Sequence, residues 1–84
     1  TWMYPINIPS SYFSNVNFRD ANLSRINFCS CSFVACDFRG ANFGANLEGA
    51  YLIDIDFRGT DLSSARLYHA TCIRVNFQGT NVNL

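Results

Sequence analysis

A five-residue repeat runs through the whole chain and leaves few folds open to it. Sixteen units of five residues and one unit of four, residues 41–44, account for all 84 residues. The third residue of each unit, which we call its centre, is apolar in every unit, although apolar residues make up only 49% of the chain. The centres are Met3, Ile8, Phe13, Phe18, Leu23, Phe28, Phe33, Phe38, Phe43, Leu47, Leu52, Phe57, Leu62, Leu67, Cys72, Phe77 and Val82.

The other positions of the unit also differ in character. The first residue is always small or β-branched, and every charged residue lies at a second, fourth or fifth position. A period of five suits neither an α-helix, with 3.6 residues per turn, nor a flat strand, with a period of two. It suits a coil whose short sides each carry one unit, with the first and central residues turned inward and a corner after each side.

Units that lie four units apart resemble one another. VNFRD, CDFRG, IDFRG and VNFQG are centred on Phe18, Phe38, Phe57 and Phe77, which are 20, 19 and 20 residues apart, and the separation of 19 contains the short unit. Repetition every four units predicts four sides and about 20 residues per coil. We therefore predict one all-β domain over residues 1–84, a parallel β-helix of about four coils that stands about 20 Å tall.

The repeating unit, seen as ANLSR, CDFRG, ANFG, ANLEG, IDFRG, TDLSS and VNFQG, closely resembles that of the pentapeptide-repeat proteins. This resemblance covers the whole chain and implies a right-handed quadrilateral β-helix with turns at its corners and a backbone ladder between coils. The first two units depart from the pattern. Pro5 and Pro9 lack an amide hydrogen, so residues 1–10 are expected to form an irregular N-terminal coil or cap.

The stacked centres should supply most of the stability, because no coil can bury its apolar surface alone. The expected core stack consists of Phe18, Phe38, Phe57, Phe77, Phe28, Leu47, Leu67, Phe33 and Leu52.

Four cysteines raise the alternatives of a disulfide, a zinc or redox site, and simple core packing. Cys31 and Cys36 lie at first positions and Cys72 at a centre, so all three should point inward, whereas Cys29 lies at an outward fourth position. No second cluster or neighbouring histidine completes a tetrahedral metal site. Core packing is therefore favoured, and unpaired inward thiols favour a reducing, cytoplasmic compartment.

The sequence offers little for catalysis. His69 is the only histidine and lies at an outward position, with Glu48 one coil away as the nearest acid on its side. There is no nucleophile motif and no phosphate-binding glycine loop. We expect no enzyme activity, no catalytic residues, no cofactor and no bound metal.

Charge also limits the partners. Six arginines balance six acidic residues, which argues against nucleic acid, and no apolar run is long enough to span a membrane. A charged strip of Arg19, Arg39, Arg58, Asp37 and Asp56 lies on the side of the phenylalanine stack. It could bind anions as an arginine ladder, but the interleaved acids favour a strip of ion pairs that neutralise one another.

The neighbouring side carries apolar residues at outward positions, namely Tyr12, Val34, Tyr51, Ile53 and Ile73. A contiguous exposed apolar strip with two tyrosines is typical of a protein-binding face or of contact with a flanking segment. The alternative is the plain preference of these residue types for strands.

Three functions follow from these features. The leading one is a non-catalytic scaffold that binds a protein partner or a flanking domain of its own chain. The resemblance suggests another, since some pentapeptide-repeat proteins mimic DNA and bind gyrase, conferring quinolone resistance; the neutral charge argues against it. The third is a structural spacer or cap in a complex. Because the last unit ends in full repeat, we expect a larger protein or a partner to cover that end, with end-to-end self-association as a further outcome.

Overall fold

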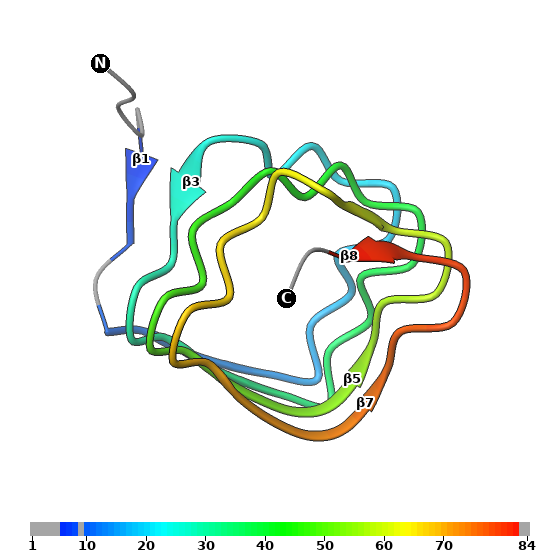
Figure 1. Ribbon diagram of the computed structural model, residues 1–84. Helices are drawn as coiled ribbons and strands as arrows, with labels where there is room; N and C mark the ends of the chain where they lie inside the picture. Colours follow the sequence, from blue (N-terminus) through cyan, green and yellow to red (C-terminus); the bar gives the residue numbers. More distant parts are fainter. Residues whose placement is uncertain (1–5, 9, 83–84) are drawn as a thin grey trace.

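The chain winds into a four-sided solenoid of stacked coils, as the repeat predicts (Figure 1). The structure, a computed structural model, describes residues 6–8 and 10–82. This part of the chain contains strands and turns and no helix. The strands are β1 (Ile6–Asn7), β2 (Tyr12–Ser14), β3 (Ile26–Asn27), β4 (Ser32–Val34), β5 (Tyr51–Asp56), β6 (Asp61–Leu62), β7 (Thr71–Asn76) and β8 (Asn81–Val82). Met3, Pro5 and Pro9, and with them most of the expected N-terminal cap, lie outside the described residues.

All pairing between coils in the described residues is parallel, and its register confirms the repetition every four units. On the first side of the solenoid β1 pairs with β3, and on the fourth side β6 pairs with β8. The second side holds a four-stranded sheet in the order β2-β4-β5-β7. Within this sheet Phe13 pairs with Phe33, Phe33 with Leu52, and Leu52 with Cys72. The offset drops from 20 to 19 across the four-residue unit, so that unit is absorbed without a break in the ladder.

The Asn and Asp residues at second positions shape the corners. The Asp37 Oδ1 atom accepts a 3.0 Å hydrogen bond from the backbone N–H of Arg39, two residues later. Asn46 with Glu48 and Asn76 with Gln78 repeat this contact at 3.0 Å. Asn and Asp are suited to such a turn because their short side chains reach the backbone two residues on.

Each fifth position turns the corner itself. Every described fifth position except Ser64 has a positive φ angle. At Gly40, with φ of 70°, the turn is closed by a 3.1 Å hydrogen bond from the Ala41 N–H to the Phe38 carbonyl. Glycine adopts this region freely, whereas Ala35, with φ of 55°, does so at a cost.

The interior is a set of stacked rings. The centroids of Phe18 and Phe38 are 4.8 Å apart, those of Phe38 and Phe57 5.1 Å, and those of Phe57 and Phe77 5.8 Å, with the ring planes within 22° of parallel. Rings on adjacent sides meet edge to face instead, as Phe28 and Phe33 do at 5.1 Å. Stacked and edge-to-face pairs are both favourable arrangements of aromatic rings.

Burial falls toward both ends of the solenoid. Of the nine residues in the expected core stack, Phe28, Phe33, Phe38, Leu47, Leu52 and Phe57 are buried, while Phe18, Leu67 and Phe77 are only half-buried. Cys72, which pairs with the inward-facing Leu52, is nevertheless exposed. The reason is positional, because Cys72 belongs to the last described coil, and within residues 6–8 and 10–82 no coil lies over it.

Candidate interaction face

The sheet β2-β4-β5-β7 brings the five apolar outward residues onto one flat surface, which we call the second-side face. Its register stacks two columns of outward side chains. One column is Tyr12, Ser32, Tyr51 and Thr71, and the other is Ser14, Val34, Ile53 and Ile73. The centres between the columns turn inward because side chains alternate across a strand.

Exposure along this face is uneven. Tyr12, Tyr51 and Ile73 are 66%, 52% and 41% exposed, whereas Val34 and Ile53 are half-buried between their neighbours in the column. The remaining outward positions of the two columns are Ser and Thr. The face therefore offers two protruding tyrosine rings beside an aliphatic ridge, with hydroxyl groups around them.

An ion pair lies along one margin of the second-side face. The Arg74 guanidinium, at a corner of the last described coil, donates to both carboxylate oxygens of Asp54 in the coil below, at 2.5 and 3.1 Å. This hydrogen bond lowers the pKa of the Asp54 carboxyl. Sequence analysis missed the pair, although opposite charges at fifth positions 20 residues apart were a usable signal.

On the third side, the charged strip forms the expected ion pairs between its members. The Nη2 atoms of Arg39 and Arg58 lie 2.7 Å from Oδ2 of Asp37 and Asp56 within their own units. A second set of contacts joins neighbouring coils, with Arg39 Nε 3.7 Å from Asp56. The hydrogen bond from each arginine side chain is the main reason that the pKa values of Asp37 and Asp56 lie below their usual range.

Arg19 sits differently at the end of this strip. Its own unit has Asn17 in place of an aspartate, and Asn17 Oδ1 accepts hydrogen bonds from both the backbone N–H and the Nε of Arg19. The Arg19 Nε atom is 3.8 Å from Asp37 in the next coil. Each arginine of the strip thus has an acidic neighbour.

The cysteines do not converge. All four are free, Cys31 and Cys36 are buried, and Cys29 is half-buried. The Cys31 thiol donates a 3.0 Å hydrogen bond to the Ile8 carbonyl one coil below. Burial raises the pKa values of the Cys29 and Cys36 thiols, which keeps them in the unreactive protonated form.

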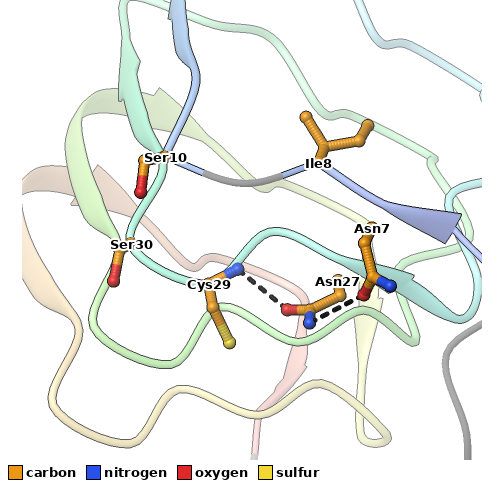
Figure 2. A pocket seen from close by; sticks show the side chains of 6 residues that line it. All are labelled: Asn7, Ile8, Ser10, Asn27, Cys29 and Ser30. Carbon is orange, nitrogen blue, oxygen red and sulfur yellow. Dashed lines mark hydrogen bonds between the residues drawn. The ribbon is translucent and has the colours of Figure 1, made fainter.

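A shallow pocket of about 340 Å³ opens between the first two coils on the first side. It is lined by Asn7, Ile8, Ser10, Asn27, Cys29 and Ser30 (Figure 2). Asn27 already accepts a hydrogen bond from the Cys29 N–H and donates one to Asn7, both at 3.0 Å. Asn7, Asn27 and the Cys29 N–H are thus bonded to one another, and Cys29 is the only titratable residue among the six that line the pocket.

In the described residues the side chains that could bind a metal ion are dispersed, and the histidine lies at the surface. The described part of the chain contains no group of three or more His, Cys, Asp or Glu side chains placed to hold a metal ion. His69 is exposed, and its ring meets the Tyr68 ring at 4.0 Å. Within residues 6–8 and 10–82 there is also no helix that could cross a membrane.

Comparison with known proteins bears on the fold. A family model for pentapeptide repeats, in eight copies, matches residues 11–44 and 43–83. HetL, a pentapeptide repeat protein involved in heterocyst differentiation regulation in the cyanobacterium Nostoc, is similar in structure, with a TM-score of 0.53 and 20% identity. That match covers 84% of this chain and 40% of HetL.

A second solved structure is Rfr23, a pentapeptide repeat protein from the cyanobacterium Cyanothece, with 24% identity and a TM-score of 0.38 over 94% of this chain and 65% of that one. The chain thus spans less than two thirds of either protein. Comparison with curated proteins gives no match.

Proposed function

Since this chain belongs to the pentapeptide-repeat family, we propose that it is a rigid, non-catalytic scaffold whose second-side face binds a protein partner. The observation that supports this most directly is the gathering of three exposed large apolar side chains, Tyr12, Tyr51 and Ile73, on one four-stranded sheet. Tyrosine is enriched in protein interfaces because it offers a large, stiff apolar surface with a polar tip.

The sheet beneath the face suits this role. Its backbone is paired from coil to coil, as in the 2.9 Å hydrogen bonds from Ser32 N–H to the Ser11 carbonyl and from Tyr51 N–H to the Cys31 carbonyl. Little backbone freedom remains to be lost when a partner docks, and this lowers the entropic cost of binding. The tyrosines also have few rotatable bonds, so ordering them costs little.

The same proposal includes the larger molecule to which the scaffold belongs and the compartment in which it lies. We place it within a larger protein or assembly, which is supported by the match to only 40% of HetL. We place it in a reducing compartment such as the cytoplasm, which is supported by two buried free thiols, Cys31 and Cys36.

The test replaces the face residues with charges. Tyr51→Arg and Ile53→Asp should each abolish recovery of the partner that the unmodified chain captures by cross-linking and pull-down. Gln78→Arg and Gln78→Asp are matched controls, because Gln78 is exposed on the third side and bonds through its backbone, its N–H donating to Asn76 Oδ1 and its carbonyl accepting from the Gly59 N–H. If the face variants retain the partner while folded, as judged by circular dichroism, the second-side face is not the binding surface.

A further inference from the structure

One outward column of the second-side face alternates long and short side chains. Its members, in coil order, are Tyr12, Ser32, Tyr51 and Thr71, and each pairs with the next in the parallel register. Tyr12 and Tyr51 are 66% and 52% exposed, whereas Ser32 between them is half-buried. Tyr51 belongs to an inner coil, with β4 and β7 on either side of its strand, so its exposure reflects its outward direction.

The coils set a fixed distance between the two tyrosines. On this side of the solenoid the stacked rings of Phe13 and Phe33, in adjacent coils, have centroids 4.9 Å apart. This agrees with the usual spacing of paired strands, about 4.8 Å. Tyr12 and Tyr51 lie two coils apart, so their backbone positions are separated by about 9.6 Å along the axis of the solenoid.

This separation matches one regular conformation of a polypeptide that lies along the axis. A polyproline II helix has three residues per turn and rises about 3.1 Å per residue, so residues on one of its faces recur about every 9.3 Å. The nearest repeats of a β-strand and an α-helix are about 6.7 and about 10.8 Å, which fit less closely. A segment with proline at every third residue therefore keeps step with the tyrosines.

The hydrogen-bonding groups of the face favour the same kind of partner. A polyproline II helix has no internal hydrogen bonds, so its carbonyl groups accept from donors outside it, whereas those of an α-helix are already bonded within the helix. Donors are available in both columns, as the hydroxyl groups of Tyr12, Ser14, Ser32, Tyr51 and Thr71. Aromatic side chains also line the surfaces on which several known modules bind proline-rich segments.

Charge and area narrow the choice of partner. Neither column carries a charge, and the charges of Asp54 and Arg74 at the margin are already paired, which suits an uncharged segment. One side of the solenoid, five residues wide and four strands tall, offers a flat area of about 300 Å². A folded partner or a second copy of the chain needs about 800 Å² on each side. An extended segment of about six residues spans the face instead.

We propose that the partner is an uncharged, proline-rich segment in the polyproline II conformation, which lies along the second-side face with its prolines beside Tyr12 and Tyr51. This inference rests on the proposed function, because it names the class of partner for the same face. The segment loses little conformational freedom on binding, since it is already extended in solution. Because the area is small, the complex is weak, with a Kd of about 100 µM.

The test is calorimetric titration of the 84-residue chain with three capped, uncharged peptides of about twelve residues. The first has proline at every third position with glutamine and alanine between, the second has the same composition with irregularly spaced prolines, and the third is a helix-former of leucine, alanine and glutamine. We expect the first peptide to bind about fivefold more tightly than the other two. The largest shifts of backbone amide NMR signals should fall in β2, β4, β5 and β7.

Variants show where the peptide binds. Tyr51→Ala should weaken binding of the first peptide about tenfold, because it removes one ring, and Tyr51→Phe about threefold, because it removes only the hydroxyl group. Tyr12→Ala should have the same effect as Tyr51→Ala. Tyr68→Ala is the matched control, because Tyr68 is 68% exposed but lies on the first side, and it should leave the affinity unchanged.

Other outcomes would overturn the inference. Equal binding of the first two peptides would contradict the match in spacing, and tighter binding of the third would make an α-helix the partner. A dimer in sedimentation velocity that is lost in Tyr51→Arg would make a second copy the occupant. If no peptide binds but Tyr51→Arg loses the partner in the pull-down, the face binds a partner of another class. If Tyr51→Arg keeps both the first peptide and the pull-down partner, the face takes no part in binding and both proposals are wrong.

Discussion

At the scale of single residues, the corners require a positive φ angle, which some residue types adopt at a greater cost in free energy than others. Apart from Ser64, the described fifth positions adopt a positive φ angle whether they hold glycine, as at Gly59, or a residue with a Cβ atom, as at Ala35 and Arg74. A left-handed conformation costs a non-glycine residue about 1–2 kcal/mol, and asparagine and aspartate tolerate it best. Ala35 has no polar side-chain group to offset that cost, so it is the most strained of these corners on chemical grounds.

Ala35→Gly should therefore stabilise the protein by about 1 kcal/mol, the reverse of the usual effect of glycine. The backbone hydrogen bond from the Ala35 N–H to the Ile53 carbonyl, at 2.9 Å, is retained in the variant. The measurement is the free energy of unfolding in urea. Ala50→Gly is the control, because Ala50 is buried, lacks a positive φ and should lose stability. A loss of stability in Ala35→Gly would contradict the strain argument.

At the scale of elements, the charged strip acts as a pH-dependent support of the third side. Asp37 and Asp56 have pKa values below the usual one because they accept hydrogen bonds from Arg39 and Arg58. A carboxyl group whose pKa is lower in the folded state adds stability that is complete above its unfolded pKa, about 4, and is lost as the pH falls through the folded value.

The double variant Asp37→Asn, Asp56→Asn removes the ion pairs of the strip and leaves the hydrogen bonds from the side chain to the backbone at the corners. Asparagine keeps the bond to the backbone two residues on, as Asn46 does with the Glu48 N–H at 3.0 Å. We expect the original chain to lose more stability than the variant when urea unfolding is repeated at pH 7 and at about pH 3. Equal losses would mean that the strip contributes nothing, as holds for many surface ion pairs.

At the scale of the whole molecule, each coil is supported only by its neighbours, so stability should be highest in the middle of the stack. Hydrogen exchange read by mass spectrometry should show the slowest amides in residues 36–57, where Phe38 and Phe57 are buried between coils. Uniform protection along the chain would instead mean that the solenoid opens only as one unit.

Much of this architecture could be predicted from the sequence, because its rule is local. Whether a residue faces inward depends on its position in a five-residue unit, and the offsets of 20, 19 and 20 between phenylalanines predicted the register of the sheet. The same rule placed Tyr12, Tyr51 and Ile73 together on one side. Whether that side is an interface is a question that no repeat pattern answers, and it stays a prediction.

The sequence by itself determined the all-β coil, the number of coils and the inward set of side chains, since these depend on periods contained within the chain. Only the tertiary structure decided how much of each inward residue is covered, because coverage depends on a coil about twenty residues away. That is why Cys72 is exposed while Leu52, at the same position one coil lower, is fully buried. The pairing of Arg74 with Asp54 follows the same stacking, since their two fifth positions lie one coil apart, but only the structure shows that the guanidinium reaches the carboxylate.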